Sequence, residues 1–387
     1  MTQARIEAAR GSGSVGGGEG TGGGARVVVP PQRGGGGRAA VSPLPEAAWW
    51  EAVSRTRHPV LTQTPRWLRC LESATPWRGS GRLYELSGGR FLVLPMVSRG
   101  AGPLRISASW PHGWGYGGVL ASDGVVTPAD LALVGADLAA TPGLRTTVVP
   151  SPFPPQRAPA LPGAKAEHHH LTQVLDLSGG AGAVWRGYSS NVRRSVKRAE
   201  REGVEVRRDA TGGALPEFAH LYRLSAARWA RNAGRPAALG RLQARLQEPP
   251  RLLEAVSRVV GEDLVTWTAY VEGRAAASVV ILHGDGHSLM WRGAQDQQLA
   301  GRTHANALLH HLAIEEAVAR GDRSYSFGES DPGSSLAAYK SKFGAVDLTW
   351  RACSFERFPV SAAGAAALRT YRSASALAGR GRGEERR

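Results

Sequence analysis

Apolar and polar residues follow two different periods along the first part of the chain, one typical of helices and one typical of strands. Helical spacing over residues 45–75 is interrupted at Pro59, so this segment predicts two helices rather than one. Two runs rich in β-forming residues flank Gly88 and Gly89 and predict a hairpin. The expected elements of this part are helices over 45–75 and 126–140 and strands over 82–86, 90–97 and 146–150.

The second part of the chain repeats this mixture with a longer series of strands. Two of its helices are expected to end at Gly203 and Gly321, because glycine readily adopts the left-handed conformation that ends a helix. Two halves of similar make-up predict an α/β (α+β) protein with two related domains, each a mixed sheet flanked by helices. The expected strands span 171–177, 204–208, 264–271, 275–282, 287–292 and 348–355, and the expected helices span 181–202, 215–233, 238–259 and 304–320.

Composition predicts four segments in the 387 residues. Residues 1–40 are glycine-rich and are expected to be disordered, because such a segment buries too little apolar surface to offset the entropy of ordering. Residues 41–163 form the expected first domain, which ends in a Pro-rich crossover over 150–163. Residues 164–360 form the expected second domain, and residues 361–387 form an Ala/Arg-rich tail.

The net charge of the chain is +16. Residues 1–40 and 379–387 account for +5 of this charge, which leaves +11 for residues 41–378. Such a surface favours a polyanionic partner, such as a nucleic acid, a nucleotide cofactor, a diphosphate-linked substrate or a phospholipid face. A coding bias toward arginine would produce the same net positive charge without any such partner.

Cysteine usage and hydropathy indicate the compartment. Cys70 and Cys353 form neither a CxxC pair nor a metal-binding spacing, which favours a reducing compartment. No apolar run approaches the length of a membrane span, and the N-terminus has no apolar signal-like region. We therefore expect a cytoplasmic protein that contacts a membrane, if at all, peripherally through its charge.

The segment "SYSFGESDPGSSLAAYKSKFGA", residues 324–345, predicts a strand, a tight turn and a short helix. Gly328 allows close backbone approach at the end of the strand. Glu329 follows it and can accept a proton or hold an amine. The helix carries Lys340 and Lys342 back past the strand end, although lysines on a short helix are more often plain surface charges.

A dense group of cations marks the expected helix 181–202. Arg193, Lys197 and Arg201 are spaced by four residues and share one stripe, with Arg194 beside it. Arginine pairs with phosphate in bidentate fashion, so the stripe suits a run of phosphates, and a solvated helix face is the equal alternative. Just upstream, Tyr188 and Asn191 could add neutral hydrogen bonds to a sugar or peptide substrate.

Four stretches, taken in this order and spacing, resemble a known family. The chain resembles the Fem-type branch of the GNAT acyltransferase superfamily and its polysaccharide-associated acetyltransferase relatives, over about residues 45–357. The resemblance implies two GNAT-like domains in tandem, the first of them degenerate, and the transfer of an acyl group to an amine. It implies either acyl-CoA or an aminoacyl-tRNA as donor. The four stretches are residues 61–73 with 111–120, 171–206, 264–295 and 319–345.

The resemblance also implies roles for particular residues. Acyl-CoA-dependent GNAT enzymes hold the pyrophosphate with a Q/R-x-x-G-x-G/A loop before a helix, and Gln298, Gly301, Arg302 and Thr303 fill this pattern except for its last small residue. An ordinary loop capped by Thr303 is the alternative.

At the expected catalytic centre, the Fem pattern has an aromatic residue followed by lysine. Tyr339 and Lys340 fill these positions, which implies a cation that stabilises the oxyanion of acyl transfer, with Glu329 as candidate base and Gly328 beside the acyl group. Lys342 is expected to be a surface residue.

Several other patterns carry little weight. His168, His169 and His170 are adjacent on an expected strand and therefore point in different directions, so a polar start of the strand is favoured over a metal site. His310 and His311 are expected to pack or to lie at a boundary. No G-x-S-x-G elbow supports a hydrolase, and no metal cofactor is expected.

The sequence is compatible with three functions. The favoured one is an N-acyltransferase that uses acyl-CoA and acts on an amine such as a cell-envelope or polysaccharide precursor. The second is an aminoacyl-tRNA-dependent transferase that builds peptidoglycan cross-bridges. The third is a non-catalytic polyanion-binding protein with the same fold, which would bind with steep salt dependence and show no turnover.

Overall fold

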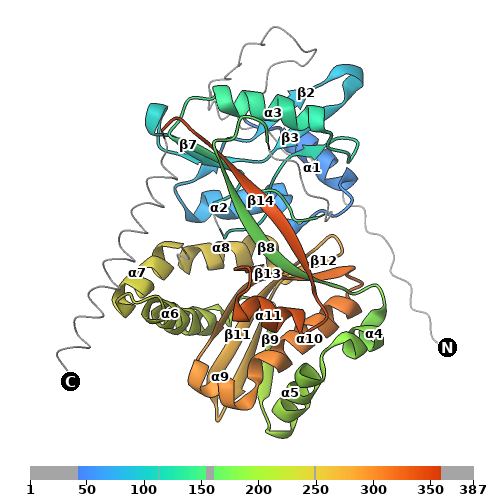
Figure 1. Ribbon diagram of the computed structural model, residues 1–387, viewed down its shortest axis with the longest axis vertical. Coiled ribbons are helices and arrows are strands. Elements are labelled where there is room, and N and C mark those ends of the chain that lie inside the picture. Colours follow the sequence, from blue (N-terminus) through green and yellow to red (C-terminus); the bar gives the residue numbers. More distant parts are fainter. Residues whose placement is uncertain (1–41, 112, 154–160, 248–249, 359–387) are drawn as a thin grey trace, which may run out of the picture.

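The computed structural model describes residues 42–111, 113–153, 161–247 and 250–358 (Figure 1). The segments 1–40 and 361–387, expected to be tails, lie outside the described residues, as does part of the Pro-rich crossover. Helices and strands mix in both halves of the described chain, which confirms the expected α/β class with a mixed sheet flanked by helices.

The elements follow the predicted order closely. The described helices are α1 (Glu46–Arg55), α2 (Pro65–Ala74), α3 (Pro128–Ala140), α4 (Gly180–Gly187), α5 (Ser190–Arg201), α6 (Leu215–Asn232), α7 (Ala237–Gln247), α8 (Pro250–Val260), α9 (Gln297–Thr303), α10 (Ala305–Ala319) and α11 (Ser335–Ser341). The described strands are β1 (Arg78–Gly79), β2 (Arg82–Glu85), β3 (Phe91–Leu94), β4 (Val97–Arg99), β5 (Ile106–Ala108), β6 (Leu120–Ala121), β7 (Arg145–Val148), β8 (Ala166–Asp176), β9 (Glu205–Asp209), β10 (Leu264–Val271), β11 (Arg274–Gly284), β12 (His287–Gln295), β13 (Ser324–Ser330) and β14 (Val346–Glu356).

Two helices that the pattern predicts as continuous are divided. The segment expected as one helix over 181–202 is α4 and α5, and the break lies at Tyr188 and Ser189. Ser189 caps α5, since its hydroxyl accepts a hydrogen bond from the Val192 N–H at 3.3 Å. The segment expected as a helix over 238–259 is likewise α7 and α8. The spacing of apolar residues therefore predicted the helical segments correctly but not the points at which they are interrupted.

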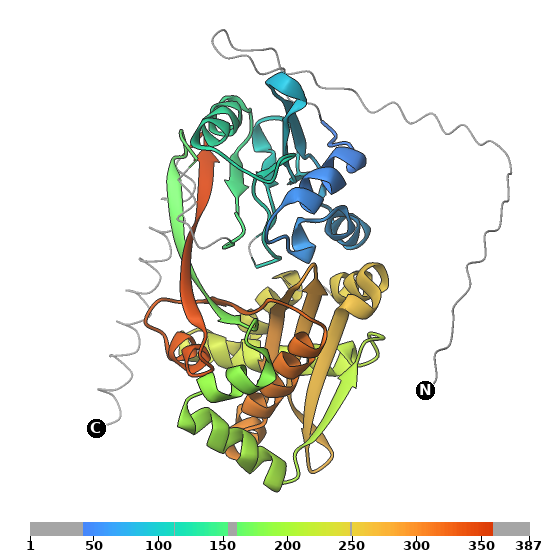
Figure 2. The ribbon, with the colours of Figure 1, turned by 90° about the vertical axis from the view of Figure 1, so that its right-hand side faces the viewer.

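One large sheet joins the two halves of the molecule. Its strand order is β1-β4-β5-β7-β14-β8-β13-β12-β11-β10-β9. β8 and β14 pair along Ala166–Val174 and run side by side between the upper and lower halves of Figures 1 and 2. The C-terminal end of β14 pairs with β7 of the first half, whereas the C-terminal end of β8 pairs with β13 of the second half. The sheet is therefore continuous across the expected domain boundary at residue 164.

The sheet has a symmetric arrangement about the β8–β14 pair. On each side the neighbouring strands include one parallel pair, β5–β7 in the first half and β12–β13 in the second. The other neighbours of these four strands are antiparallel. This repeat agrees with two related domains in tandem.

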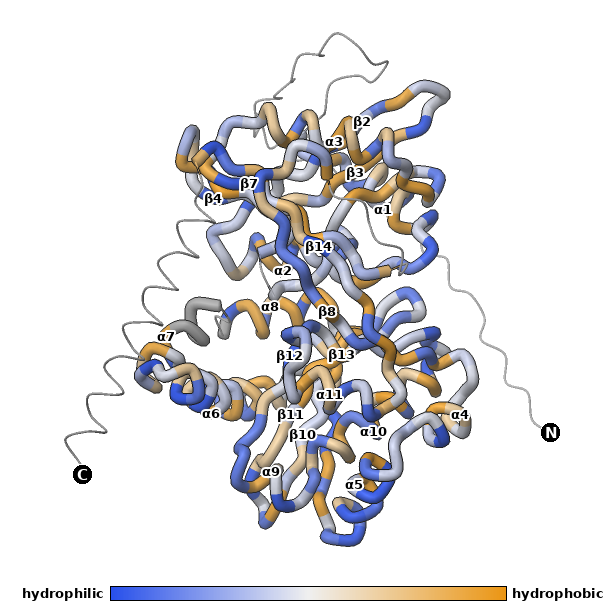
Figure 3. The backbone as a smooth tube through the Cα atoms, viewed as in Figure 1, coloured by the Kyte–Doolittle hydropathy of each residue, from blue (hydrophilic) through white to orange (hydrophobic). Residues whose placement is uncertain are grey.

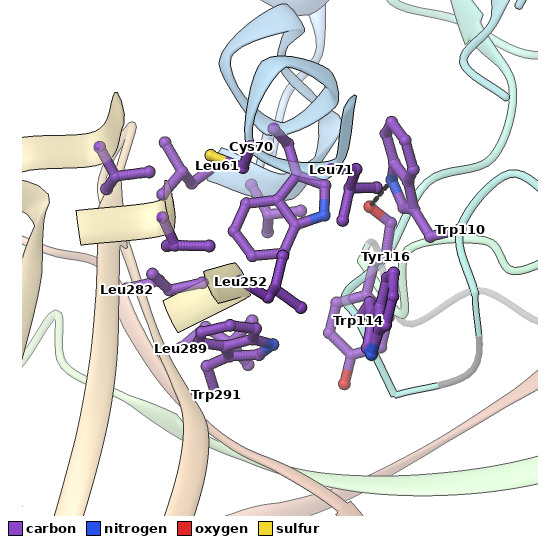
Figure 4. Close-up of a cluster of buried hydrophobic side chains, with 14 of the residues drawn as sticks. Leu61, Cys70, Leu71, Trp110, Trp114, Tyr116, Leu252, Leu282, Leu289 and Trp291 are labelled. Atoms are coloured by element: carbon purple, nitrogen blue, oxygen red, sulfur yellow. Dashed lines mark hydrogen bonds between the residues drawn. The ribbon is translucent and has the colours of Figure 1, made fainter. Parts of the chain in front are cut away.

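A hydrophobic core fills the contact between the halves (Figure 4). Leu71 and Trp110 of the first half and Leu282 of the second lie in one cluster of buried side chains and are each at most 1% exposed. Trp67 of α2 packs edge-to-face on Trp291 of β12, with ring centroids 5.3 Å apart. Because apolar burial is the main stabilising term in folding, this shared core holds the halves together as one unit.

The face of α5 away from the core is hydrophilic (Figure 3). Val192, Val196 and Ala199 are buried in the core of the second half. Arg194, Lys197 and Arg201 are exposed on the other side of the helix. The amphipathic pattern of α5 thus leaves its cations available at the surface.

Candidate active site

The parallel strands β12 and β13 part at the centre of the second half. Their ladder runs from His287–Ser324 to Leu289–Ser326 and then stops. Directly beyond this point β12 has one extra residue, Trp291, relative to β11. β13 likewise has one extra residue relative to β8, between Ser326 and Glu329. Bulges of this kind bend a strand and end its pairing, so the two strands diverge.

A pocket of about 810 Å³ occupies the divergence. Its walls come from β11, β12, β13, α6, α9, α10 and α11 of the second half, together with Ser195 of α5 and the first-half loop Gly113–Tyr116. Trp114 and Tyr116 of this loop are at once part of the core between the halves and part of the pocket wall. A concave site between domains is where ligands are usually bound.

The bulge of β13 depends on Gly328. Its φ is +68°, a region that side chains other than glycine rarely adopt. A Cβ atom at this position would lie 3.0 Å from the Met290 carbonyl oxygen of β12. The extra residue also moves Glu329 onto the face of the sheet that carries its ladder partner, Thr172. The predicted close approach of backbone at Gly328 is therefore present in the structure.

Lys340 of α11 is buried and bound to this bulge. The residue is 2% exposed, and its Nζ donates to the carbonyl oxygens of Gly328 at 3.1 Å and Glu329 at 2.8 Å. Burial lowers the pKa of Lys340 to about 8, and the charge of Glu329 opposes that shift. Lys342 is exposed, as expected for a surface residue. The ammonium thus uses two of its three N–H donors on the bulge, and Lys340 also lines the pocket.

Tyr339 and His310 form the apolar wall beside Lys340. The Tyr339 hydroxyl is buried, has no hydrogen-bond partner among the described residues, and has its pKa raised by burial. His310, which packs on Phe327 with ring centroids 5.2 Å apart, has its pKa lowered to about 3 by burial, with the Lys340 charge adding. At neutral pH the tyrosine therefore keeps its proton and the histidine is neutral. His310 packs as expected, and it also lines the pocket.

Glu329 lies between the pocket and the β8–β14 pair. The residue lines the pocket, and its Oε2 is 3.4 Å from Nδ1 of His170 on β8. The His170 ring stacks on Trp350 of β14, with centroids 4.2 Å apart and planes 10° apart. The sequence pattern treats the three histidines as the polar start of a strand and misses this contact. Only the pairing of β8 with β13 distinguishes His170 from its neighbours.

The predicted pyrophosphate loop is helical. Gln298, Gly301, Arg302 and Thr303 all lie in α9, whose N-cap Asp296 accepts hydrogen bonds from the N–H groups of its first turn. The Thr303 hydroxyl donates to the Leu299 carbonyl at 3.1 Å, so Thr303 is not the cap of a following helix.

A left-handed residue separates α9 from the next helix. His304, with φ +57°, lies between α9 and α10. Gly301 lines the pocket, whereas Gln298 and Arg302 are exposed outside its wall. The structure therefore brings one of the four predicted donor-binding residues to the pocket.

The predicted substrate-binding residues of the basic helix lie beside the pocket rather than in its wall. Tyr188 is buried between α4 and α5, and its carbonyl accepts a hydrogen bond from the Arg193 guanidinium. Asn191 is exposed and pairs with Arg194. Lys197 is exposed on the same helix as Ser195, which does line the pocket.

The charge of the pocket wall is positive. Among the described residues that line it, Arg228, Arg292 and Lys340 are cationic and Glu329 is acidic. Burial lowers the pKa of Arg228, whose guanidinium donates to the Gln295 carbonyl at 3.3 Å. Arg292 lies over the Trp291 ring, 4.5 Å from its centroid. An anionic ligand therefore suits this pocket better than a cationic one.

Within residues 42–358, apart from the gaps stated above, no group of three or more His, Cys, Asp or Glu side chains could hold a metal ion. No helix in the same part of the chain is both long and apolar enough to cross a bilayer.

Residues 186–341 match the family model described as "Acetyltransferase (GNAT) domain". This match covers the parted strands and the part of the pocket wall that the second half supplies, and it confirms the expected GNAT-type acyltransferase domain in the second half. No curated protein sequence matches the chain.

Solved structures share the fold at low sequence identity. FemX is 11% identical with a TM-score of 0.55, and the alignment covers 80% of this chain and 96% of that one. A tandem GNAT protein from the clavulanic acid biosynthesis pathway is 15% identical with a TM-score of 0.45, over 80% and 93% of the two chains. L-PGS from Bacillus licheniformis is 13% identical with a TM-score of 0.43, over 82% and 95%. The FemX likeness supports a Fem-like GNAT fold over most of the chain.

Proposed function

We propose that the protein is an N-acyltransferase that transfers an acyl group from acyl-CoA to the amine of an acceptor such as a cell-envelope or polysaccharide precursor. The observation that carries this proposal is the parting of β12 and β13 at two bulges, with Glu329, Lys340 and Tyr339 around the resulting pocket. A gap between two strands accepts an extended acyl chain, and the groups around it supply a base, a cation and a proton donor.

The transfer follows from these three side chains. The amine nitrogen attacks the acyl carbonyl and forms the new C–N bond, while its proton passes to the Glu329 carboxylate. The carbonyl electron pair moves to the oxygen, where the remaining Lys340 N–H stabilises the negative charge. The intermediate then collapses, the bond to the donor sulfur breaks, and the thiolate takes a proton from the Tyr339 hydroxyl. Tyr339 regains a proton from the solvent while Glu329 releases the amine proton to the solvent, which restores both side chains.

The donor end of the pocket is assigned by its cations. Ser195 of α5 and Gly301 of α9 line the same pocket, and α5 also carries the exposed cations Arg194 and Lys197. Gln298 and Arg302 are exposed on the adjacent helix α9. We assign this end to the phosphates of the donor, with bidentate arginine contacts as the physical basis.

One observation favours aminoacyl-tRNA as a second candidate donor. The carboxylate of Asp296 already accepts from the first-turn N–H groups of α9, where the predicted loop was to hold a pyrophosphate. The phosphates of a tRNA could instead bind along the stripe of cations on α5, and such binding does not require the N-terminus of α9. On this alternative the protein is a cross-bridge transferase, and the same three catalytic side chains act on an ester instead of a thioester.

Thermal unfolding of the full chain with acetyl-CoA, free CoA or deacylated tRNA, each at two salt concentrations, tests both candidates. A ligand at about 100 times its Kd adds about 2.7 kcal/mol to the free energy of unfolding, which is easily measured. We expect stabilisation by CoA species, lost in Arg194→Ala plus Lys197→Ala. Stabilisation by tRNA and not by CoA species would indicate aminoacyl-tRNA as the donor in place of acyl-CoA. Salt-sensitive tRNA binding without transfer from any acyl donor would favour the non-catalytic polyanion-binding protein.

A cytoplasmic location and peripheral contact with a membrane stay predictions. Leu239 and Leu242 are exposed on α7 beside the exposed Arg241, a combination that suits an anionic lipid surface. Flotation of the full chain with vesicles of anionic or neutral phospholipid measures this contact directly.

A further inference from the structure

We infer that His170 is a positioning residue for acyl transfer, whose imidazole holds the Glu329 carboxylate ionised and oriented toward the pocket. The inference rests on the proposed function, in which Glu329 takes the proton of the attacking amine. It adds a residue that neither the sequence pattern nor the family match assigns.

His170 lies behind Glu329 as seen from the pocket. Oε2 of Glu329 is 3.4 Å from Nδ1 of His170, and the two side chains are 31% and 17% exposed. Glu329 lines the pocket, whereas His170 is not among the described residues that do. The imidazole therefore lies behind the carboxylate and acts on the substrate through it.

The bulge of β13 creates this contact. Glu329 pairs with Thr172 on β8, and His170, two residues before Thr172, lies on the same face of the sheet. Without the extra residue in β13, Glu329 would take the opposite face and point away from His170. The backbone bonds of Lys340 to Gly328 and Glu329 hold the bulge in place. The bulge, the base and the histidine thus form one unit.

The His170 ring is fixed before any substrate binds. Trp350 is its direct ladder partner on β14, and the two rings stack with planes 10° apart. This stacking removes rotational freedom from the imidazole and presents its Nδ1 edge to Glu329. A pre-oriented support of this kind costs no reorganisation at the moment of reaction.

Other charged and titratable groups face the same carboxylate. The Lys340 ammonium bonds to the Glu329 backbone carbonyl. The Tyr116 hydroxyl, from the first half, has its pKa raised by burial and further by the charge of Glu329. Lys340 supplies a positive charge on the α11 side, and the proposed Nδ1–H of His170 faces the carboxylate on the β8 side. A carboxylate that accepts a hydrogen bond favours its ionised form, which is the form a base requires.

The role of His170 involves no covalent change at the imidazole. In the proposed role an Nδ1–H of His170 points at the carboxylate, and no bond of the imidazole is made or broken. In the transfer step the amine proton goes to Glu329, while His170 keeps its own proton. The expected effect is therefore on the rate of the proton transfer and not on binding of the acceptor.

Replacement of the histidine tests the inference in the full-length protein. With acetyl-CoA as donor and D-glucosamine as the amine probe, His170→Phe keeps the stacked ring and removes the N–H. We expect kcat to fall on the order of a hundredfold, as for other misplaced catalytic groups, at unchanged KM. The acid limb of the pH–rate profile should also move to higher pH, because Glu329 then keeps a proton more readily.

Two further variants separate positioning from packing. His170→Asn places an amide N–H near the position of Nδ1 and should restore most of kcat and the original pH profile. His169→Phe alters the exposed neighbour on the opposite face and should leave both unchanged. Wild-type kcat and an unshifted profile in His170→Phe would overturn the inference.

A measurement without substrate separates this inference from the proposed function. Nitrogen-15 NMR of the histidine side chains should show His170 protonated on Nδ1 in the wild type and shifted toward Nε2 in Glu329→Ala, with His169 unchanged. Identical His170 signals in both proteins would overturn the inference. The expected signals in a protein that transfers no acyl group would uphold the contact and count against the proposed function instead.

Discussion

The two halves of the molecule contain equivalent pairs of neighbouring parallel strands and use them in opposite ways. β5–β7 in the first half stays closed beyond its last ladder pair, Ala108–Thr147. The Ser109 N–H donates to the Thr147 carbonyl at 2.8 Å, and the Ser109 hydroxyl accepts from the Val149 N–H at 2.7 Å. Trp110, with no exposed surface, fills the space next to this seam.

β12–β13 in the second half opens at the corresponding place. Both strands carry an extra residue just beyond their last ladder pair, whereas the registers of β5 and β7 run without a shift. The comparison teaches that the order of the strands does not by itself produce a site. The bulges do, because they leave a gap in the sheet and turn Glu329 toward it.

The largest expected effect comes from removing the lysine that holds the bulge of β13 in the open pair β12–β13. Lys340→Met removes the ammonium that bonds both carbonyls of the bulge and the charge beside the acyl group. We expect kcat to fall about 10²- to 10³-fold, the usual loss for a group that stabilises an oxyanion. Steady-state acyl-transfer assays measure this loss. Lys342→Met is the matched control, because Lys342 is the exposed C-cap residue of the same helix, and this variant should show wild-type kcat.

Removing a hydrogen bond that holds the closed pair β5–β7 together should lower the stability of the protein and leave catalysis unchanged. Ser109→Ala leaves the buried Val149 N–H without its partner, which costs about 1–3 kcal/mol of the free energy of unfolding. Urea denaturation measures this cost, and kcat should stay at the wild-type value. Ser107→Ala, within the ladder of the same strand, is the control for the loss of a buried hydroxyl. A large loss of kcat in Ser109→Ala would mean that the first half takes part in the chemistry.

Filling the gap of the open pair should have a moderate effect. Gly328→Ala forces a side chain into a left-handed residue, which costs about 1–2 kcal/mol, and places a Cβ against the Met290 carbonyl. Gly333→Ala shows the first effect alone, since its φ is +71° and no atom lies within 4 Å of the added Cβ. Both variants should lose stability in denaturant, Gly328→Ala the more, and Gly328→Ala alone should lose activity. Equal activity in the two would show that the bulge tolerates movement.

The smallest expected effect concerns the first ladder pair of the open strands. The ring of His287 bonds to the Ser324 hydroxyl at 2.7 Å. Burial lowers the pKa of His287 to about 4, with Arg323 and His58 adding and Asp322 opposing. The unfolded chain takes up this proton near pH 6.5, so the free energy of unfolding should fall as the pH falls from about 6.5 to 4.

Denaturant titrations across this window measure the dependence on pH. His287→Gln should flatten it in part, because the pKa of the neighbouring His58 is also lowered by burial. His220→Gln, an exposed histidine on α6, should leave the slope as in the wild type. An unchanged slope in His287→Gln would assign the dependence on pH to other groups.

Local sequence determined most of the elements and one part of the site. The turn at Asp331–Gly333, the cap at Ser334 and the short helix that brings Lys340 back to Gly328 all follow from residues close together in the chain. The glycine at position 328 and the lysine in the last turn of α11 were therefore predictable. The same holds for the hairpin of β2 and β3 and for the α/β class.

The tertiary structure alone decided the rest of the site. His170 and Glu329 are 159 positions apart, and they meet because β8 pairs with β13 and because β13 carries one extra residue. Periodicity reports which residues share a face of one strand, but a bulge and a register are properties of two strands together. For the same reason, the residues at 298–303 match a loop motif in the sequence yet form a capped helix in the structure. The sequence thus determined the parts, and the pairing of distant strands determined which side chains face the pocket.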